Sequence, residues 1–343
     1  VSYAQRSYHY MKSYGVTKLR RKVQERLYRN SLEKGYQNWM IKSRPAESEK
    51  ELQRAHPFHY APCISVVVPV YRTQEKYLRE MIESVLSQTY QNLELCIADG
   101  SGEEDSARAV IESYRGQDSR IRYEKLSRNL GISGNTNAAL SLATGEYLAL
   151  LDHDDVLEEH ALFEIVKWLS AHPETDMLYS DEDKLTSDSS VYFQPHFKPD
   201  FNPELLRSNN YICHLLVVRR NLLEKAGMYR EEFDGAQDYD FILRCSEQAE
   251  AIGHIPKILY HWRCHDASTA GNPENKAYAY EAGRRALECH LKRTGLSGTV
   301  ERMENPGFYR TVYACSSTPK VSIVVLDVYG LSLIHISEPT RPY

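Results

Sequence analysis

The sequence has little of what marks membrane-spanning, disulfide-bonded or nucleic-acid-binding proteins. No apolar run approaches the roughly 18–20 residues that cross a bilayer, and no signal peptide is visible, although a chain that begins at Val1 leaves room for an upstream segment. The seven cysteines are scattered without a Cys-x-x-Cys pair, which favours reduced thiols in a cytosolic protein over disulfides or a zinc site. The formal net charge of −5 gives no overall attraction for nucleic acid.

The remaining composition is that of a globular protein. The chain has 343 residues, of which 42% are hydrophobic and 26% charged. This length suits one large domain or two modest ones.

Residues 1–56 differ from the rest because they are rich in lysine, arginine and tyrosine. Val16, Leu19, Val23 and Leu27 recur at helical spacing, so we expect a helical N-terminal extension of one or two amphipathic helices. Two interpretations stay open. The basic extension packs on the main domain, or it makes peripheral contact with an anionic surface, such as the inner face of the cell membrane, or with an acidic partner.

From residue 64 onward the pattern alternates between strand and helix. The predicted strands are 64–71, 93–99, 121–126, 146–152 and 176–183, and the predicted helices are 75–87, 106–114, 133–145 and 159–173. Such alternation predicts an α/β, Rossmann-like fold with a mostly parallel sheet and helices on both faces. In these sheets ligands bind beyond the carboxyl ends of the strands, where Asp99 and Asp152 fall.

The second half of the chain is less regular. Prolines interrupt residues 190–230, helices are predicted over 238–249 and 275–295, and 251–268 predicts a short strand pair that ends in a histidine-rich loop. Near the end, 321–329 resembles 64–71, so 320–329 is expected to start a second similar domain. Residues 330–343 resemble translated sequencing-adapter sequence and are expected to be a non-native tail.

Three carboxylates, Asp152, Asp154 and Asp155, directly follow a predicted buried strand. Asp-x-Asp at a strand end offers oxygen ligands to Mg²⁺ or Mn²⁺, and a bound dication would relieve the repulsion among the acids. An acidic turn without a ligand is the plainer alternative. A third interpretation is the Asp-x-Asp-x-Val motif of haloacid-dehalogenase-type phosphatases, but that motif usually lies on the first strand, whereas this one follows about the fourth.

Two further aspartates are candidates for binding and catalysis. Asp99 either caps the turn after its strand or accepts a hydrogen bond from a nucleobase or ribose. Asp238 and Asp240 begin a predicted helix, where acidic residues favour the helix dipole. A carboxylate at the mouth of a pocket is also a suitable general base for a hydroxyl group, and we assign that role to Asp238 and a structural role to Asp240.

The segment "HWRCH" (261–265) supplies two imidazoles and a guanidinium near the end of the predicted core. Histidine is a common metal ligand, and Arg263 suits a diphosphate. The alternative is a packed Trp262 with polar neighbours on the surface. The acidic run 181–183 at another strand end either borders a bound sugar or forms a solvated turn.

Taken together, the motifs resemble the inverting family 2 glycosyltransferases with a GT-A fold, and more closely the bacterial branch for cell-surface polysaccharides that includes rhamnan-type enzymes. The motifs are "SVVVPVY" (65–71), "LCIADGS" (95–101), "RNLGISGNTNAAL" (128–140), "GEYLALLDHDD" (145–155), "MLYSDEDKL" (177–185), "FKPDFNPELLRSNNYI" (197–212), "GAQDYDFILR" (235–244) and "ILYHWRCHDASTA" (258–270). They occur in order within 60–315, which is therefore expected to be one glycosyltransferase domain.

The resemblance implies a nucleotide-diphosphate sugar as donor, Mg²⁺ or Mn²⁺ as cofactor, and a glycan or lipid-linked glycan as acceptor. By motif match, the nucleotide would contact Pro69, Val70, Tyr71 and Asp99, and the donor would also contact Asp152 and Arg263. Asp152 and Asp154 would bind the metal together with His265, with His261 as the second candidate. Asp238 would be the catalytic base.

The sequence departs from the family pattern at two of these motifs. Ala98 precedes a single aspartate where many members have two, and Gln237 stands where many have an acidic residue before the base. A non-catalytic module that keeps the fold as a carbohydrate- or nucleotide-binding scaffold is therefore the rival hypothesis. The presence of Asp152, Asp154 and Asp238 together argues for the enzyme.

Overall fold

The computed structural model describes residues 34–102, 106–265 and 277–314, with isolated positions 317, 320 and 322. The amphipathic pattern of Val16 to Leu27 lies outside the described residues, as do the tail 330–343 and nearly all of 320–329. Among the described helices, none combines the length and the apolar composition required to cross a bilayer.

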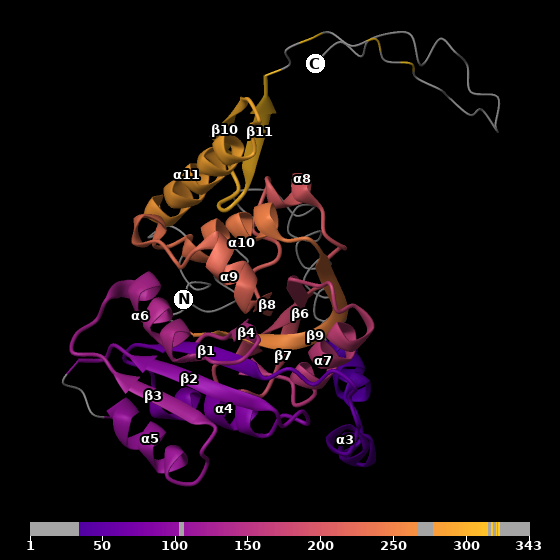
Figure 1. Ribbon diagram of the computed structural model, residues 1–343, viewed down its shortest axis with the longest axis vertical. Helices are drawn as coiled ribbons and strands as arrows, with labels where there is room; N and C mark the ends of the chain where they lie inside the picture. The colour runs from indigo at the N-terminus through magenta and orange to yellow at the C-terminus, as the bar shows by residue number, and fades with distance from the viewer. Residues whose placement is uncertain are drawn as a thin grey trace, which may run out of the picture.

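A nine-stranded sheet organises the described part of the chain (Figure 1). Its strands run in the order β3 (Ile121–Lys125), β2 (Leu93–Asp99), β1 (Ile64–Val70), β4 (Tyr147–Leu150), β8 (Leu216–Arg219), β6 (Met177–Thr186), β9 (Ile252–Cys264) and β5 (Val156–Leu157), with β7 (Tyr192–His196) paired to β6. The first four strands are parallel to one another, as are β6 and β9. The expected α/β class is confirmed, and β8 joins the two parallel groups by antiparallel pairing with β4 and β6.

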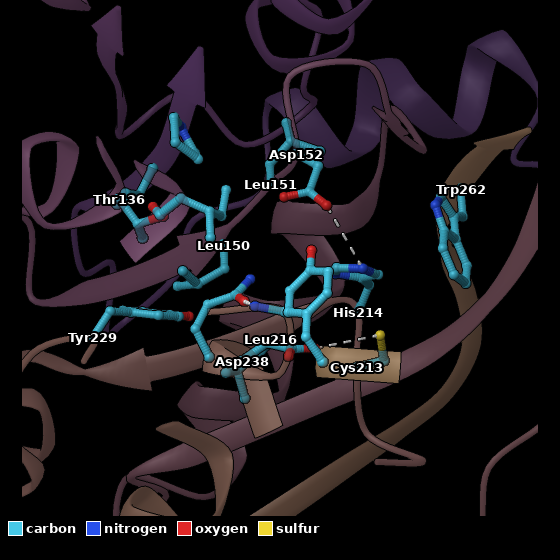
Figure 2. Close-up of a pocket in the computed structure, with 16 residues that line it drawn as sticks. Thr136, Leu150, Leu151, Asp152, Cys213, His214, Leu216, Tyr229, Asp238 and Trp262 are labelled. Atoms are coloured by element: carbon cyan, nitrogen blue, oxygen red, sulfur yellow. Dashed lines mark hydrogen bonds and ion pairs between the residues drawn. The ribbon is translucent and has the colours of Figure 1, made fainter. Parts of the chain in front are cut away.

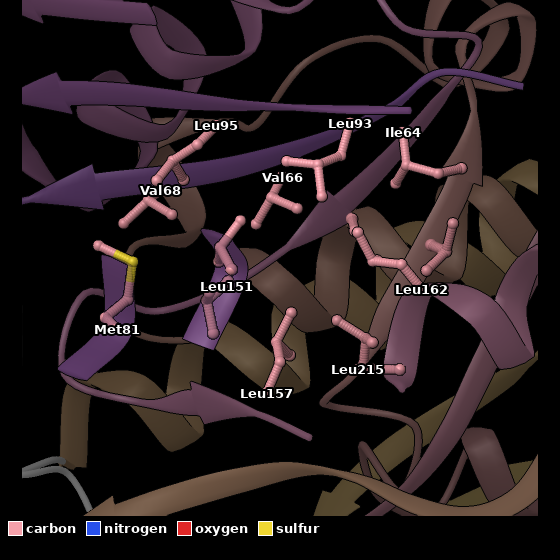
Figure 3. Packing of buried hydrophobic residues seen from close by; sticks show 14 of the residues in the cluster. Ile64, Val66, Val68, Met81, Leu93, Leu95, Leu151, Leu157, Leu162 and Leu215 are labelled. Atoms are coloured by element: carbon pink, nitrogen blue, oxygen red, sulfur yellow. The ribbon is translucent and has the colours of Figure 1, made fainter. Parts of the chain in front are cut away.

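Strand β1 is buried along its whole length because both faces of the sheet are covered. Alternate side chains enter two different cores: Val66 and Val68 pack beneath α4 (Glu75–Leu86), whereas Val67 packs on the other side with α6 (Gly131–Leu142). Figure 3 shows the first core, to which α5 (Ser106–Arg115) and α7 (Ala161–Ala171) also contribute. A continuous run of β-branched residues is typical of a strand in this position.

Two features of the second half differ from expectation. The irregular region 190–230 contains β7, α8 (Pro203–Leu206), β8 and α9 (Arg220–Ala226), so it supplies a central strand that its prolines conceal. The strand pair predicted over 251–268 is wrong, because β9 is one strand of 13 residues. Its backbone groups pair with β6 from Ile252 to Cys264, with register shifts at Asp181 that let the strand bend and continue.

The last described elements lie on one side of the sheet (Figure 1). They are η1 (Glu231–Phe233), α10 (Gln237–Gln248), α11 (Ala277–Arg293) and the antiparallel hairpin of β10 (Gly298–Arg302) and β11 (Tyr309–Tyr313). Helix α10 is largely buried between the sheet and α11. The N-terminus of α10 therefore faces the strand ends, which brings Asp238 toward the candidate site.

The described part of the N-terminal extension is anchored to the far end of the sheet. Residues 34–43 are helical and are followed by α3 (Glu47–Arg54). The hydroxyl of Tyr36 donates to Asp183 at 2.6 Å, and Nε of Arg44 donates to Glu158 at 2.7 Å. This portion of the extension therefore packs on the main domain.

Both of these carboxylates also hold His261, which is buried. Nδ1 of His261 lies 2.5 Å from Oδ1 of Asp183, and Nε2 lies 2.8 Å from Oε1 of Glu158. Burial alone would lower the pKa of His261, but the carboxylates of Asp183 and Glu158 outweigh burial and raise it to about 10. We call Tyr36, Arg44, Glu158, Asp183 and His261 the anchor cluster.

The raised pKa of His261 predicts a stability difference that depends on pH. Because its folded pKa of about 10 exceeds the ordinary 6.5, its stabilisation is complete below pH 6.5 and is lost as pH rises through about 10. We expect His261→Gln to lower the unfolding free energy by about 3 kcal/mol at pH 6, and by progressively less toward pH 10. Urea denaturation across this range measures the difference. The exposed His172→Gln is the matched control, and a difference independent of pH would contradict a charged His261.

Candidate active site

A cavity of about 350 Å³ opens beyond the carboxyl ends of β1 and β4. Its walls combine apolar residues with a few polar ones, as is usual for small-molecule sites. Residues from the strand ends are Val67, Pro69, Leu150, Leu151 and Asp152; α6 contributes Ile132 and Thr136; and the C-terminal half contributes Cys213, His214, Leu216, Tyr229, Gly235, Gln237, Asp238, Trp262 and Tyr278. Figure 2 shows Asp152 and Asp238 on different walls of this cavity.

Asp152 follows β4 and carries one of the two carboxylates that line the cavity. Its Oδ2 lies 3.9 Å from Nε2 of His214, as the dashed line in Figure 2 shows. The backbone N–H of Asp152 points to the hydroxyl oxygen of Tyr260 at 3.3 Å. Tyr260 of β9 therefore helps to fix the loop that follows β4.

Asp155 does not line the cavity and is fully buried. Its carboxylate accepts hydrogen bonds from the Tyr260 hydroxyl and, at 2.7 Å, from the backbone N–H of Arg263. Burial is the main cause that raises its pKa well above the ordinary value, and the charges of Asp154 and Asp152 add to this effect. The electrostatic crowding predicted from the sequence is thus concentrated on Asp155.

Asp154 and His265 meet although 111 positions separate them in the sequence. Nε2 of His265 lies 2.7 Å from Oδ2 of Asp154, and the imidazole stacks on Tyr77 with ring centroids 5.3 Å apart. Both side chains are partly exposed, with 16% and 19% of the area of each accessible. A nitrogen and a carboxylate oxygen this close form a donor pair suited to a divalent cation.

A second group of donors lies deeper. One ligand atom each from Asp152, Asp155 and His214 falls within 4.8 Å of the others. Among the described residues this is the group of three donors that fits a divalent cation, whereas Asp154 and His265 form a pair of two.

His214 was not identified from the sequence. It stacks on Tyr260 with ring centroids 4.5 Å apart and an angle of 8°, and its backbone N–H donates to Oε2 of Glu182 at 3.1 Å. The only signal was a histidine directly before the apolar run that becomes β8. Since that run lay in the irregular region, its register in the sheet was hidden.

Asp238 is the second residue of α10 and faces the cavity. Its Oδ2 accepts a hydrogen bond from Asn210 at 2.8 Å, and Sγ of Cys213 lies at 3.9 Å. Burial raises the pKa of Asp238, an effect that the charge of His214 partly opposes and that of Asp152 reinforces. Asp240, in contrast, is fully buried in ion pairs with Arg230 and Arg244, in line with the structural role expected for it.

Of "HWRCH", Trp262 alone lines the cavity. Arg263 is fully buried and binds the carbonyl oxygen of Asp154 at 2.6 Å and Glu80 at 2.7 Å. The expected contact of Arg263 with a diphosphate is therefore replaced by support for the acidic loop. His261 belongs to the anchor cluster, so its expected approach to a metal or diphosphate is wrong.

The predicted nucleotide residues are placed at the ends of β1 and β2. Pro69 lines the cavity, Val70 is fully buried, and Tyr71 is exposed beside Arg72. Asp99 is buried and accepts hydrogen bonds from the Ser101 N–H, the Tyr123 hydroxyl and the Lys125 ammonium group. The structure thus gives Asp99 the turn-capping contact and leaves its contact with a nucleoside a prediction.

The acidic run on β6 is buried rather than solvated. Asp181 accepts from the Lys198 N–H at 2.9 Å and lies 2.8 Å from His254, and Glu182 pairs with the Lys198 ammonium group at 3.2 Å. Asp183 belongs to the anchor cluster. The interpretation of 181–183 as a solvated turn is wrong.

Residues 65–227 match the family described as glycosyl transferase family 2. An uncharacterized protein of Sinorhizobium fredii is 43% identical over 85% of this chain and 32% of its own length. The O-antigen biosynthesis protein RfbC of Myxococcus xanthus is 38% identical over 84% of this chain and 23% of RfbC. This chain thus spans about a third and about a quarter of these two relatives. An uncharacterized glycosyltransferase of Methanocaldococcus jannaschii is 30% identical over 67% of this chain and 80% of its own length.

Solved structures share the fold. TarS of S. aureus in complex with UDP-GlcNAc has a TM-score of 0.54 and 22% identity over 66% of both chains. The mannosyltransferase PcManGT from Pyrobaculum calidifontis, in complex with GDP-Man and Mn²⁺, has a TM-score of 0.50 and 17% identity over 72% of this chain and 69% of that one. The phosphatase interpretation is excluded by the family match, and the chain belongs to glycosyl transferase family 2.

Proposed function

We propose that the protein transfers a sugar from a nucleotide-diphosphate sugar to a hydroxyl group of a glycan or lipid-linked glycan, with inversion at the anomeric carbon, in the synthesis of a cell-surface polysaccharide. The observation that carries this proposal is the shared cavity. Asp152 at the end of β4 and Asp238 at the start of α10 line it together. The first belongs to the Asp-x-Asp motif for the donor, and the second is free of the ion pairs that occupy Asp240.

The donor is proposed to enter along the ends of β1 and β4. Pro69 and Asp152 line this side of the cavity, and Asp99 and Tyr71 lie further along the same edge of the sheet. Relatives and structural neighbours support a nucleotide sugar, since TarS binds UDP-GlcNAc and PcManGT binds GDP-Man.

Asp154 and His265, together with Asp152, would hold the divalent cation. We prefer this set because Asp154 and His265 are partly exposed, whereas both oxygens of Asp155 already accept hydrogen bonds in the interior. A bound Mg²⁺ or Mn²⁺ supplies positive charge that stabilises the diphosphate as the glycosidic bond breaks.

Asp238 is the proposed general base. Its carboxylate takes the proton from the acceptor hydroxyl while that oxygen forms a bond to the anomeric carbon. The bond from the anomeric carbon to the diphosphate oxygen breaks on the opposite side, and the nucleoside diphosphate leaves with the bonding electrons. The raised pKa of Asp238 makes it a stronger base than an exposed aspartate, and Asn210 orients it.

A scaffold that binds a sugar or a nucleotide without catalysis remains the rival hypothesis. It would bind the donor in the wild-type protein and in Asp238→Asn alike, and neither would release nucleoside diphosphate. The enzyme hypothesis predicts that binding and turnover respond to different residues.

Donor binding is the first prediction for this site. We expect one or more of UDP-glucose, UDP-GlcNAc, GDP-mannose and dTDP-rhamnose to raise the melting temperature, and to do so more strongly with Mn²⁺ than with EDTA. Differential scanning fluorimetry of the full chain measures the shift. If no nucleotide sugar stabilises the protein in a metal-dependent way, the proposed function is wrong.

Substitution of Asp238 separates catalysis from binding. We expect Asp238→Asn to retain the donor-induced melting shift and to lower kcat by about 10²–10⁴-fold, because the proton acceptor is removed. Asp240→Asn is the matched control on the same helix, which should lower the melting temperature through its arginine partners while kcat changes little. Transfer by Asp238→Asn at the wild-type rate would remove Asp238 from the role of base.

Substitution of single residues distinguishes the two candidate sets of metal ligands. We expect Asp154→Asn and His265→Gln to weaken the Mn²⁺ dependence of donor binding by about 10–100-fold, because each removes a ligand. Asp155→Asn should keep most of it, since its carboxylate serves Tyr260 and Arg263. Isothermal titration of the donor with and without Mn²⁺ measures the effect. The reverse result would select Asp152, Asp155 and His214 as the ligands.

A further inference from the structure

A second cavity of about 250 Å³ adjoins the first. It is lined by Glu182, Asp183, Lys184, Gln194, His196 and Trp262. Trp262 lines both cavities and so forms the wall between them, and Figure 2 shows it on the side of the first cavity that holds His214. We call the second cavity the Trp262 pocket.

Strand register places Trp262 on the same side as two residues that line the Trp262 pocket. Glu182 pairs with Tyr260 and Lys184 with Trp262, so these four side chains point to the same side. Tyr260 stacks on His214 in the first cavity. Because Trp262 lines both cavities, a linear molecule bound in the first cavity can continue past its indole into the Trp262 pocket.

The backbone of β7 is distorted at the pocket. Between its pairs with Glu182 and Lys184, β7 contains an extra residue, and Gln194 within this bulge has a φ of +49°. A non-glycine residue in this conformation is strained, and bulges redirect side chains at functional sites. Lys184 donates to Oε1 of Gln194 at 3.0 Å, which fixes the amide at the pocket wall.

The lining offers the chemistry that a neutral sugar ring requires. The indole of Trp262 is an apolar flat surface. The ring of His214 meets it edge to face with centroids 6.0 Å apart, and the Lys184 ammonium nitrogen lies 5.6 Å from its centroid. The exposed side chains of Gln194 and His196 can exchange hydrogen bonds with hydroxyl groups. The negative charge of Glu182 is balanced by the ammonium group of Lys198. Burial alone would raise the pKa of Glu182, but Lys198 and the neighbouring histidines lower it to about 2.

We propose that the Trp262 pocket binds the second sugar of the glycan acceptor, while the terminal sugar presents its hydroxyl to Asp238 in the first cavity. This inference rests on the proposed function. It assigns the acceptor class as a glycan of at least two sugars rather than a single sugar or a lipid alcohol. Trp262, Gln194 and His196 are then residues that determine acceptor specificity.

The test compares acceptors of one and two sugars with the full chain and the donor that gives the largest melting shift. The probes are the methyl glycosides of rhamnose, glucose, galactose, mannose and N-acetylglucosamine, and methyl disaccharides that end in each of them. We expect the disaccharide that ends in the preferred sugar to have a KM about tenfold below that of the matching monosaccharide, at similar kcat. The reason is that one stacked and hydrogen-bonded ring adds about 1–2 kcal/mol to the binding free energy of the acceptor.

The variants Gln194→Ala and His196→Ala should reduce this KM advantage toward one, and Trp262→Leu should abolish it. Gln117→Ala, an exposed glutamine after α5, is the matched control and should keep the advantage. Equal KM values for monosaccharide and disaccharide in an active wild-type protein, or an advantage that survives all three substitutions, would overturn the role of the Trp262 pocket in acceptor binding but not the proposed function. A wild-type protein that binds and transfers none of the donors would overturn the proposed function, and the pocket with it.

Discussion

The repulsion among three aspartates at the end of β4 is the constraint on which the rest of the site depends. A strand end that carries Asp152, Asp154 and Asp155 is stable only if other elements supply compensating groups. Nearly all of them come from β9 or from the residue that follows it: Tyr260 and the backbone of Arg263 bind Asp155, the Arg263 side chain binds the loop carbonyl, and His265 meets Asp154. Strand β9 therefore has to extend as far as the loop that carries these aspartates.

Sequence reasoning was most effective where the pattern is local. The β-branched run of β1 and the alternation of strands with helices predicted the parallel half of the sheet, and the family resemblance placed Asp152 and Asp238 in one site, whose cavity both residues line. It failed where pairing is non-local. Nothing near Val217 shows that β8 lies antiparallel in the middle of the sheet, and nothing near His261 shows that Asp183 and Glu158 surround it. His214 was missed for the same reason.

Strand β9 serves two sides of the molecule at once. Trp262 lines the cavities and Tyr260 stacks on His214, whereas His261 and Arg263 point to the opposite side, toward the anchor cluster and Glu80. The N-terminal segment reaches β9 through this second side, since Tyr36 and Arg44 bind the carboxylates that hold His261. A segment outside the matched family region is thus part of the support of the site.

The pairing of Asp183 with His261 has a consequence for how the strands align. These two residues are register partners between β6 and β9, and their side chains also form a buried ion pair. Sliding β9 by one position would turn every side chain to the other face and leave an imidazolium and a carboxylate buried without partners. The buried ion pair therefore fixes the alignment of β9 with β6, and with it the side of the sheet on which each β9 side chain lies.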